Sequence, residues 1–437
     1  MKAIRIGMIG CGVVGGGVAD LLARRGKDLA ARVGAPIELV KVAVRDMSKR
    51  RDAPIDESIF TTNPYEVVDS QDVDVVLEVM GGQDPALDLT LRAVKNGKHI
   101  VTANKHLLAL HGTQVYEAVE TAGVELGFEA AVAGAVPIIR SLKGAFAANR
   151  IESVHGIVNG TGNYILSRMA DEGKTFDVIL KDAQKLGYAE ADPTFDVEGI
   201  DSAHKIAILA SLAFETPIDF DAVYTEGITP ITPEDIAMAR EFGHRIKLLA
   251  IAKRAGDEVD VRVHPAMIPV TDPIANVNGA LNAVEVEGDF AGVNMLVGPG
   301  AGAGPTASAV MGDVVDIARK MLHGGVGRTP PMNVPSSSMK KLKTRSIDKT
   351  LSRYYLRFTV PDTPGVLAMI AGALGESGIS IASMIQRGHE EDKPVSVVLT
   401  THTAMEADLK KALAKIGSLN VCAAPTVTIR IEGDGEE

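Results

Sequence analysis

The N-terminal part of the chain alternates between short apolar runs and longer amphipathic stretches. Four apolar runs predict strands, at residues 3–9, 37–44, 74–79 and 98–102. Apolar residues also recur at helical spacing, for example at Val14, Val18 and Leu21. Helices are therefore predicted over 13–33 and 85–96. Strands that alternate with helices are typical of a parallel sheet covered by helices on both faces.

The middle of the chain, about 150–325, mixes helical and extended patterns without regular alternation. The patterns predict helices over 162–172, 175–186, 201–213 and 232–252. They predict strands over 151–158, 258–268, 281–287 and 290–298. This mixture favours an α+β unit.

A linker and a small third unit follow. Proline, serine and clustered charge over 326–352 are typical of a linker. The segments beyond it are predicted, in order, as a strand, a helix, two strands, a helix and a strand, at 354–360, 364–377, 379–385, 395–400, 404–416 and 425–431. This βαββαβ order in so short a segment predicts a ferredoxin-like unit.

Composition narrows the class of protein. The formal net charge is −11, which disfavours bulk attraction to nucleic acid or to an anionic membrane, although a local basic patch could still bind phosphate. No run of eighteen uninterrupted apolar residues predicts a membrane span, and no signal-peptide pattern opens the chain. The two cysteines, Cys11 and Cys422, lie too far apart in sequence for a disulfide framework. A reducing cytoplasm is the simplest setting.

A glycine-rich motif follows the first predicted strand and opens the first helix. It reads G-x-G-x-x-G, and its residues are Gly10, Cys11, Gly12, Val13, Val14 and Gly15. In this context the motif predicts a Rossmann-type dinucleotide site. The glycines allow a tight turn, close approach of pyrophosphate and helix–strand packing, and the helix N-terminus attracts the phosphates. The alternative is a plain glycine-rich turn.

The end of the second strand bears on the choice between NAD and NADP. NAD sites usually place an acid there, whereas this chain has Arg45, with Lys49, Arg50 and Arg51 close behind. A guanidinium is suited to a 2′-phosphate, which favours NADP. Asp46 leaves NAD use possible, and a solvated basic loop is the non-functional alternative.

The segment 183–205, AQKLGYAEADPTFDVEGIDSAHK, resembles the signature of homoserine dehydrogenases. Further segments that resemble this family begin at 101, 128, 159 and 298, so that the resemblance covers roughly 1–325. The C-terminal segment resembles ACT amino-acid-binding domains through YLRFTVPDTPGVLAMIAGALGESGISI. The combination is similar to the monofunctional, ACT-bearing type. It implies NAD(P)-dependent interconversion of L-homoserine and L-aspartate 4-semialdehyde in threonine, methionine and isoleucine biosynthesis.

The resemblance implies roles for individual residues. Lys205 is expected to donate or accept the proton that accompanies hydride transfer, and Asp201, on the same predicted helix face, to assist it. Lys105 matches the second active-site lysine and is expected to lie beside the nicotinamide of the cofactor and the substrate. Its charge could lower the pKa of Lys205 and polarise the carbonyl. Taken without the signature, the Asp201–Lys205 spacing would usually indicate only a surface ion pair, and Lys105 a solvated loop lysine.

Other positions match substrate, cofactor and cation sites of the family. Glu190 and Asp196 are expected to accept the substrate ammonium, and Gly160 to let the ligand approach the backbone. Gly302 matches a glycine near the cofactor, although Gly160 and Gly302 could equally be structural turns. The resemblance also implies a monovalent cation, Na⁺ or K⁺, held mostly by backbone oxygens at Glu129, Val132, Gly134 and Val136. A plain strand and turn is the alternative for that stretch.

These patterns divide the chain into four parts. They are an NAD(P)-binding Rossmann domain over 1–150, a catalytic and dimerisation domain over 151–325, a linker over 326–352 and an ACT regulatory domain over 353–432. The resemblance implies a homodimer or homotetramer and control by an amino acid, with threonine expected. A non-catalytic amino-acid sensor, or an enzyme for another substrate, is the alternative function. Thioester chemistry of the aspartate-semialdehyde-dehydrogenase kind is excluded because no cysteine lies mid-chain.

Overall fold

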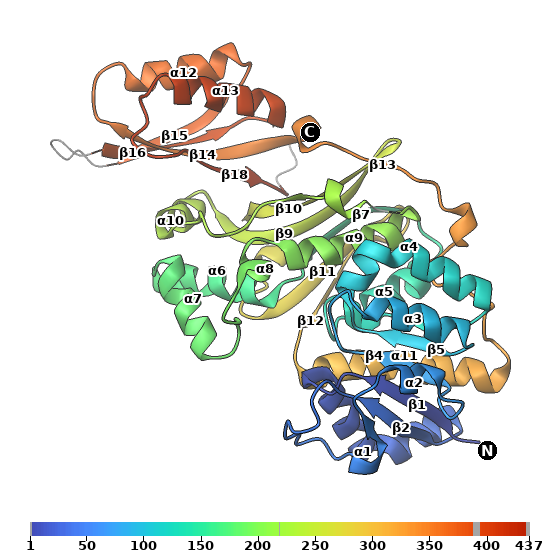
Figure 1. The fold of residues 1–437 in the computed structure, drawn as a ribbon. Helices are drawn as coiled ribbons and strands as arrows, with labels where there is room; N and C mark the ends of the chain where they lie inside the picture. Colours follow the sequence, from blue (N-terminus) through green and yellow to red (C-terminus); the bar gives the residue numbers. More distant parts are fainter. Residues whose placement is uncertain (1, 218, 388–393, 434–437) are drawn as a thin grey trace.

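The N-terminal apolar runs form one parallel sheet in the order β3-β2-β1-β4-β5-β6 (Figure 1). The computed structural model describes residues 2–217, 219–387 and 394–433. The strands are β1 (Ile4–Ile9), β2 (Ile37–Ala43), β3 (Phe60–Thr61), β4 (Val75–Glu78), β5 (His99–Thr102) and β6 (Leu126–Gly127). Four helices belong to this unit, α1 (Val13–Val33), α2 (Tyr65–Asp69), α3 (Ala86–Lys95) and α4 (Lys105–Ala122). The strand order confirms the predicted Rossmann-type α/β fold. The strands β3 and β6, two residues each, are too short to leave an apolar run.

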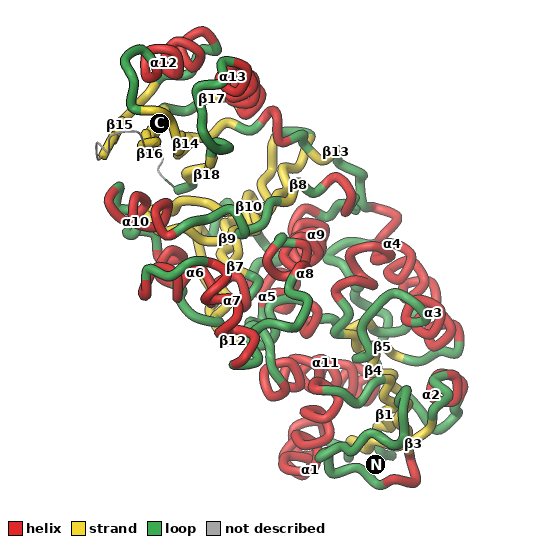
Figure 2. The backbone as a smooth tube through the Cα atoms, turned by 60° about the vertical axis from the view of Figure 1, so that its left-hand side comes forward, coloured by secondary structure: helices red, strands yellow, loops and turns green. Residues whose placement is uncertain are grey.

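The last helix of the middle segment, α11 (Ala303–His323), returns to the N-terminal sheet. It packs along α1, and Ala307, Val310 and Val314 join the core that contains Val18. Figures 1 and 2 both show α11 beside α1. At Gly17 a Cβ atom would lie 2.5 Å from the carbonyl oxygen of Ala303. This close approach brings the N-termini of α1 and α11 together, although more than half of the chain separates them in sequence.

The middle segment forms an antiparallel sheet with helices against it. The strands, in sheet order, are β12 (Gly292–Pro299), β11 (Leu281–Gly288), β7 (Ile151–Ile157), β9 (His244–Ala255) and β10 (Glu258–Pro269). The helices are α5 (Ile138–Arg140), α6 (Gly160–Glu172), α7 (Phe176–Lys185), α8 (Thr194–Val197), α9 (Ile200–Phe214) and α10 (Pro233–Glu241). The α+β prediction for this segment is thereby confirmed.

The predicted helix over 232–252 is wrong in its second half. The helix α10 ends at Glu241, and His244–Ala255 forms β9, which pairs antiparallel with β10 along its whole length. Gly243, at φ +74°, follows the helix end. Most of β9 is buried, so its near-continuous apolar run lacks the alternation of a half-exposed strand. Periodicity alone cannot separate such a run from a buried helix.

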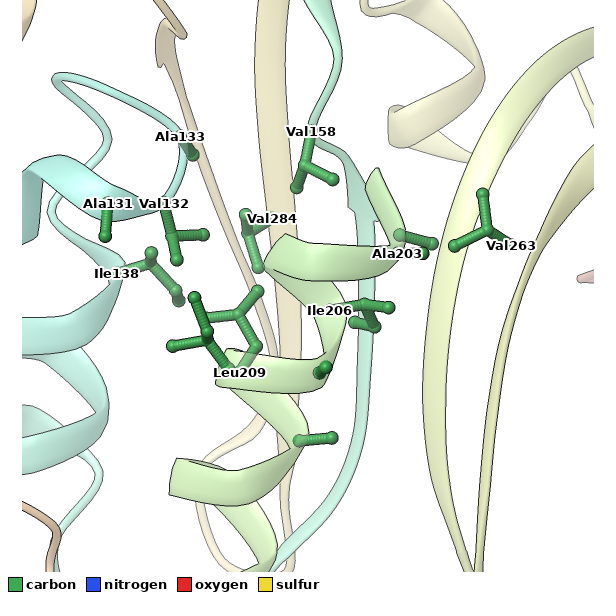
Figure 3. Packing of buried hydrophobic residues seen from close by; sticks show 14 of the residues in the cluster. Ala131, Val132, Ala133, Ile138, Val158, Ala203, Ile206, Leu209, Val263 and Val284 are labelled. Carbon is green, nitrogen blue, oxygen red and sulfur yellow. The ribbon is translucent and has the colours of Figure 1, made fainter. Parts of the chain in front are cut away.

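The helix α9 is buried nearly all round, and its burial fixes the position of its first turn. Apart from its first residue and Lys205, every residue of α9 is buried. Figure 3 shows Ile206 and Leu209 of α9 among apolar side chains from other elements, including Ile138 of α5 and Val284 of β11. The polar groups of α9 gather near its N-terminus, at Asp201 and Lys205, where the helix meets α4.

The C-terminal unit has the predicted βαββαβ order. Its elements are β14 (Leu351–Pro361), α12 (Val366–Glu376), β15 (Ile381–Arg387), β16 (Pro394–Thr401), α13 (Glu406–Ser418) and β18 (Val427–Ile431), with the short β17 (Ala404–Met405) before α13. The sheet order β18-β14-β16-β15 is that of a ferredoxin-like fold. The strand β18 also pairs with β10, which joins the C-terminal sheet to the middle sheet edge to edge (Figure 1).

The segment 326–352, which the sequence predicts to be a linker, is mostly irregular up to the start of β14 at Leu351, and it is tied to the units that it crosses. The short strand β13 (Lys343–Thr344) pairs with β10. The backbone N–H of Ser336 donates to the Glu120 carboxylate, and that of Leu342 donates to the Thr216 hydroxyl. Within the described ranges, no helix combines the length and the apolar character that crossing a membrane requires.

Candidate active site between two units

Two lysines from distant parts of the chain meet at one carboxylate. Lys105 is the first residue of α4 in the N-terminal unit, whereas Asp201 and Lys205 lie one turn apart on α9. The Nζ of Lys105 lies 2.8 Å from Asp201 Oδ1, and the Nζ of Lys205 lies 2.7 Å from Asp201 Oδ2. The structure therefore brings together the three residues that the resemblance assigns to catalysis. They lie where the N-terminal unit contacts the middle unit, at α4 and α9.

Burial and neighbouring charge act differently on the two lysines. The side chain of Lys205 is 12% exposed and that of Lys105 40%. Burial lowers the pKa of Lys205, and the charge of Lys105 lowers it further, against the opposing effect of Asp201. Burial also opposes the charge on Lys105, but Asp201 and other nearby carboxylates outweigh it and raise the pKa of Lys105. Lys205 is therefore the lysine that loses its proton more readily.

Asp201 remains ionised although it is buried. Burial raises the pKa of its carboxyl group, but the charges of Lys205 and Lys105 outweigh that effect and hold it well below its usual range. Lys205 also donates a hydrogen bond of 2.7 Å to the carbonyl oxygen of Val158. The ammonium group is thus oriented by the end of β7 as well as by its own helix.

Asn159 connects the acidic residues of this site, and the sequence analysis missed it. It precedes α6, and its amide nitrogen Nδ2 lies 2.7 Å from Asp196 Oδ1 and 2.8 Å from Asp201 Oδ2. Its Oδ1 accepts a hydrogen bond from the backbone N–H of Gly162, so Asn159 is the N-cap of α6, and the helix begins at Gly160 rather than at the predicted residue 162. An Asn before a helical pattern is an N-cap signal that the sequence did contain.

The remaining acidic residues line the approach to Lys105. Burial raises the pKa of Asp196, and the neighbouring Asp201 raises it further. Glu190 lies on an exposed loop, close enough for its charge to raise the pKa of Lys105. Asp192 instead accepts hydrogen bonds from the backbone and hydroxyl of Thr194, as a turn residue does. Asp192 therefore has the contacts of a turn residue, as one reading of the sequence Asp192-Pro193 allows.

An aromatic stack closes the side of the site. The ring of His204 on α9 stacks on Phe220 at a centroid distance of 4.3 Å and lies 4.9 Å from the ring of His106 on α4. Burial lowers the pKa of His204 to about 4, and the neighbouring His106 contributes. The His204 ring is therefore neutral near pH 7 and packs as an apolar group beside the charged cluster.

The glycine loop has the geometry that the motif predicts. Gly10 has φ +101°, and a Cβ there would lie 2.7 Å from the carbonyl oxygen of Val79. A Cβ at Gly15 would collide with the carbonyl oxygen of Gly10, whereas Gly12 has open space beside it. Val14 packs against the core of the N-terminal unit, and Val13 is exposed beside the loop. The loop thus leaves its backbone accessible at Gly12 and Val13.

A cavity of about 730 Å³ opens beside this loop. It is lined by the start of α1, by the start of α11 just after Gly302, and by the basic loop that contains Lys49, Arg50 and Arg51. The phosphates of a dinucleotide fit two helix N-termini and the cationic side chains that line this cavity, Arg24, Arg25, Lys49, Arg50 and Arg51. Arg45 is exposed just beyond the end of β2 and is not among the residues that line this cavity.

The four residues that match the family's cation site lie in one buried turn, at Glu129, Val132, Gly134 and Val136. The Glu129 carboxylate accepts hydrogen bonds from the backbone N–H groups of Ile139 and Arg140, and the main-chain oxygen of Glu129 accepts one from the N–H of Val132. The turn contains two consecutive residues with positive φ, Ala133 and Gly134, which redirect the carbonyl groups.

Three family models match the chain. The model described as "Homoserine dehydrogenase, NAD binding domain" matches residues 10–129, the model "Homoserine dehydrogenase" matches 137–315, and the model "ACT domain" matches 354–420. The first two cover the N-terminal and middle units, and the third covers most of the C-terminal unit. The matches follow the order of the three units along the chain.

Full-length relatives have the same organisation. A homoserine dehydrogenase of Pseudomonas aeruginosa is 44% identical, over 99% of this chain and 99% of its own length. The crystal structure of a homoserine dehydrogenase from Thiobacillus denitrificans is 45% identical, with a TM-score of 0.92 and 99% of each chain covered. A hyperthermophilic archaeal homoserine dehydrogenase mutant, solved in complex with NADPH, shares the fold at 23% identity and a TM-score of 0.63, over 73% of this chain and 98% of its own. The chain therefore belongs to the homoserine dehydrogenase family of NAD(P)-dependent oxidoreductases, in the form that carries a C-terminal ACT domain.

Proposed function

We propose that Lys205 is the proton acceptor and donor of the reaction and that Asp201 and Lys105 assist it. Oxidation of L-homoserine to L-aspartate 4-semialdehyde removes a hydride from the alcohol carbon and a proton from its hydroxyl group. When bound, the oxidised nicotinamide cofactor would accept this hydride. The single observation that carries the assignment is the pair of lysines on one buried carboxylate. The test is the turnover of a Lys205→Ala variant.

The opposite pKa shifts of the two lysines suit them to different roles in the reaction. Burial and Lys105 lower the pKa of Lys205, which allows it to accept the hydroxyl proton in one direction and return it in the other. Lys105 keeps its charge and is available to stabilise negative charge that develops on the substrate oxygen. Asp201 orients both ammonium groups and keeps their charges compensated. The observed burial and pairing support these roles.

We infer that the amino-acid end of the substrate meets Asp196, Glu190 and the start of α6. Carboxylates suit the α-ammonium group, and both acids lie near Lys105. The first turn of α6, at Gly160, offers backbone N–H groups to the α-carboxylate. A Cβ at Gly160 would lie 2.8 Å from the carbonyl oxygen of Ala280, so glycine also suits the packing there.

For the cofactor we propose a preference for NADP, with NAD also used. The loop Gly10–Gly15 and Gly302 hold the pyrophosphate region, and the basic residues after β2 meet the 2′-phosphate. Arg51 donates to the carbonyl oxygens of Asp46 and Lys49 and so holds this loop in shape. Two arginines are candidates for contact with the 2′-phosphate: Arg50, which lines the cavity, and Arg45, which the sequence analysis singled out. The NADPH complex of the archaeal relative is consistent with this preference.

We expect Arg50→Ala to raise the KM for NADP about tenfold, because a charge-assisted hydrogen bond contributes about 1.5 kcal/mol or more. The KM for NAD, which lacks the 2′-phosphate, should change less than about twofold. Arg45→Ala is the matched variant on the same loop, and its effect on the ratio of the two constants measures its own contribution. Equal changes for NADP and NAD in both variants would refute phosphate recognition by this loop.

We propose that the ACT unit binds an amino acid, with threonine expected, and that binding inhibits the enzyme. The structure offers a path for coupling. Arg430 of β18 binds Glu226, and the next residue, Gly227, packs against Glu198 between α8 and α9. The backbone N–H of Ile228 also donates to the carbonyl oxygen of Val197. A displacement of β18 would therefore be transmitted to the junction of α8 and α9, which carry Asp196 and Asp201.

We expect millimolar L-threonine to lower the turnover of the full-length enzyme, whereas D-threonine should have no effect. Deleting residues 345–437 is a poor test of inhibition by threonine, because it would also damage the middle unit. The deletion would expose the edge of β10 and leave buried groups such as Asp235 without their ACT partners. Glu226→Gln keeps the chain intact and weakens the link to Arg430. It should reduce inhibition while threonine binding, measured by calorimetry, persists. Binding of threonine to the wild type without any loss of activity would exclude inhibition by this effector.

We propose in addition a cytoplasmic homodimer or homotetramer that holds Na⁺ or K⁺ at the turn of Glu129, Val132, Gly134 and Val136. The edge strand β12 and its hairpin expose Phe290, Val293 and Val297, an apolar surface of the kind that associates. Sedimentation should give twice or four times the chain mass, and a monomer would exclude the oligomer. Activity that is unaffected when both cations are replaced by a bulky organic cation would count against the cation site.

A further inference from the structure

The amide of Asn159 has its hydrogen-bonding groups committed in three directions. Its Oδ1 accepts from the Gly162 N–H at 2.7 Å, and its Nδ2 lies 2.7 Å from Asp196 Oδ1 and 2.8 Å from Asp201 Oδ2. An ionised carboxylate accepts and cannot donate, so the NH₂ group must face the two aspartates. One side chain, 5% exposed, therefore caps α6 and joins α8 to α9.

Two aspartates share this donor, and their mutual repulsion has to be balanced. The charge of Asp201 raises the pKa of Asp196, and the hydrogen bond from Asn159 lowers it. The amide supplies one hydrogen to each carboxylate and adds no charge of its own. It can therefore hold both acids ionised without changing the charge balance around Lys205. A lysine or an arginine in this place would stabilise the carboxylates but would also compete with Lys205 for Asp201.

We propose that Asn159 is a positioning residue of the reaction, which holds Asp196 in place for the substrate ammonium and Asp201 in place for the two lysines. This proposal rests on the proposed roles of those residues. Asp201 Oδ2 accepts from Asn159 and from Lys205 together, so the amide sets the side on which the ammonium group must lie. Loss of the amide should therefore weaken substrate binding, and a charged replacement should also shift the ionisation of Lys205.

The charged and titratable groups around this amide come from four segments. They are Lys105 and His106 at the start of α4, Glu190 on the loop before α8, Asp196 on α8, and Asp201, His204 and Lys205 on α9. A carboxylate in place of the amide would add a negative charge beside Asp201 Oδ2 and would remove both donors. The added charge favours the protonated form of Lys205. Homoserine oxidation, which needs the neutral lysine, should then require a higher pH.

The experiment compares Asn159→Asp and Asn159→Ser with the wild type in homoserine oxidation across pH. Asp and Ser are good N-cap residues, so both variants should still fold, which thermal unfolding and NADPH binding would check. In the wild type, kcat/KM should rise with pH as Lys205 loses its proton, and this part of the pH profile is the rising limb. In Asn159→Asp the rising limb should move to higher pH by about one unit. In Asn159→Ser the limb should stay within a few tenths of a unit, while kcat/KM for homoserine falls about tenfold and the KM for NADP is unchanged.

Asn163→Asp is the control, since it places a carboxylate one turn further along α6. There the new charge faces the Nζ of Lys247, which lies 3.1 Å from Asn163 Oδ1, and not the paired aspartates. Because the change also removes the hydrogen bonds from the Asn163 amide to the carbonyl oxygens of Val277 and Leu281, thermal unfolding checks the fold of this variant too. Its rising limb should match that of the wild type. The proposal is overturned if Asn159→Asp and Asn159→Ser both keep the wild-type limb and kcat/KM. Failure of the underlying function would instead appear as near-normal turnover of Lys205→Ala.

Discussion

Lys205→Ala lowers the turnover number with L-homoserine by on the order of a hundredfold or more, as the loss of a general base does. The side chain lies 2.7 Å from both Asp201 Oδ2 and the carbonyl oxygen of Val158, so its ammonium group is held in one place between β7 and α9. With Lys205 removed, the ion pair with Lys105 at 2.8 Å still favours the ionised form of Asp201, so its carboxylate is a poor proton acceptor. The dissociation constant of NADP should change less than about twofold, since Lys205 does not line the cavity proposed for the cofactor. Stopped-flow and steady-state rates with homoserine and NADP measure the effect.

Lys185→Ala is the matched control for this prediction. Lys185 ends α7 in the same unit, and its side chain is exposed, so loss of its amine should leave turnover unchanged. Exogenous alkylamines offer a second check, because a small amine can occupy the space of the deleted side chain and restore part of the rate. Turnover of Lys205→Ala within a few-fold of the wild type would remove Lys205 from the chemistry.

Arg430→Met destabilises the junction between the ACT and middle units by about 3–5 kcal/mol, the usual cost of removing one partner from a buried ion pair. The Arg430 side chain is 2% exposed and binds Glu226 at 2.8 Å and Glu406 at 2.6 Å. Methionine would fill much of the space but leave both carboxylates without their cation. Urea unfolding at neutral pH, followed by circular dichroism, measures the loss.

The pH dependence of this loss has a definite sign. Burial opposes ionisation of Glu226, but Arg430 outweighs it and lowers its pKa. The stabilising contribution of that pair is therefore present above the unfolded-state pKa of about 4.3 and disappears as pH falls through the lower folded value. The gap between wild type and Arg430→Met should be widest near neutrality and should shrink below about pH 4. Arg150→Met, which breaks only the exposed Arg150–Glu152 pair, should cost less than about 1 kcal/mol.

Local patterns were sufficient for most of the fold. The strand–glycine loop–helix at the N-terminus and the βαββαβ order at the C-terminus are both found as predicted. Such patterns report which face of a segment is buried, a property of a few neighbouring residues. The prediction failed at β9 because a strand buried on both faces lacks that alternation. The contact between Asp201 and Lys205 could also be predicted, because the two residues share a helix face at the spacing seen in the family signature.

The sequence by itself therefore determined the family, the order of the units and the residue types of the candidate active site. Only the tertiary structure decided that Lys105 reaches Asp201, that Asn159 joins Asp196 to Asp201, and that β18 extends the middle sheet. It also placed Arg50, and not Arg45, in the wall of the cavity proposed for the cofactor. These contacts join residues far apart in the chain, and they depend on how whole helices and sheets pack. No local periodicity records that packing, because side chains that meet across an interface leave no fixed spacing in sequence.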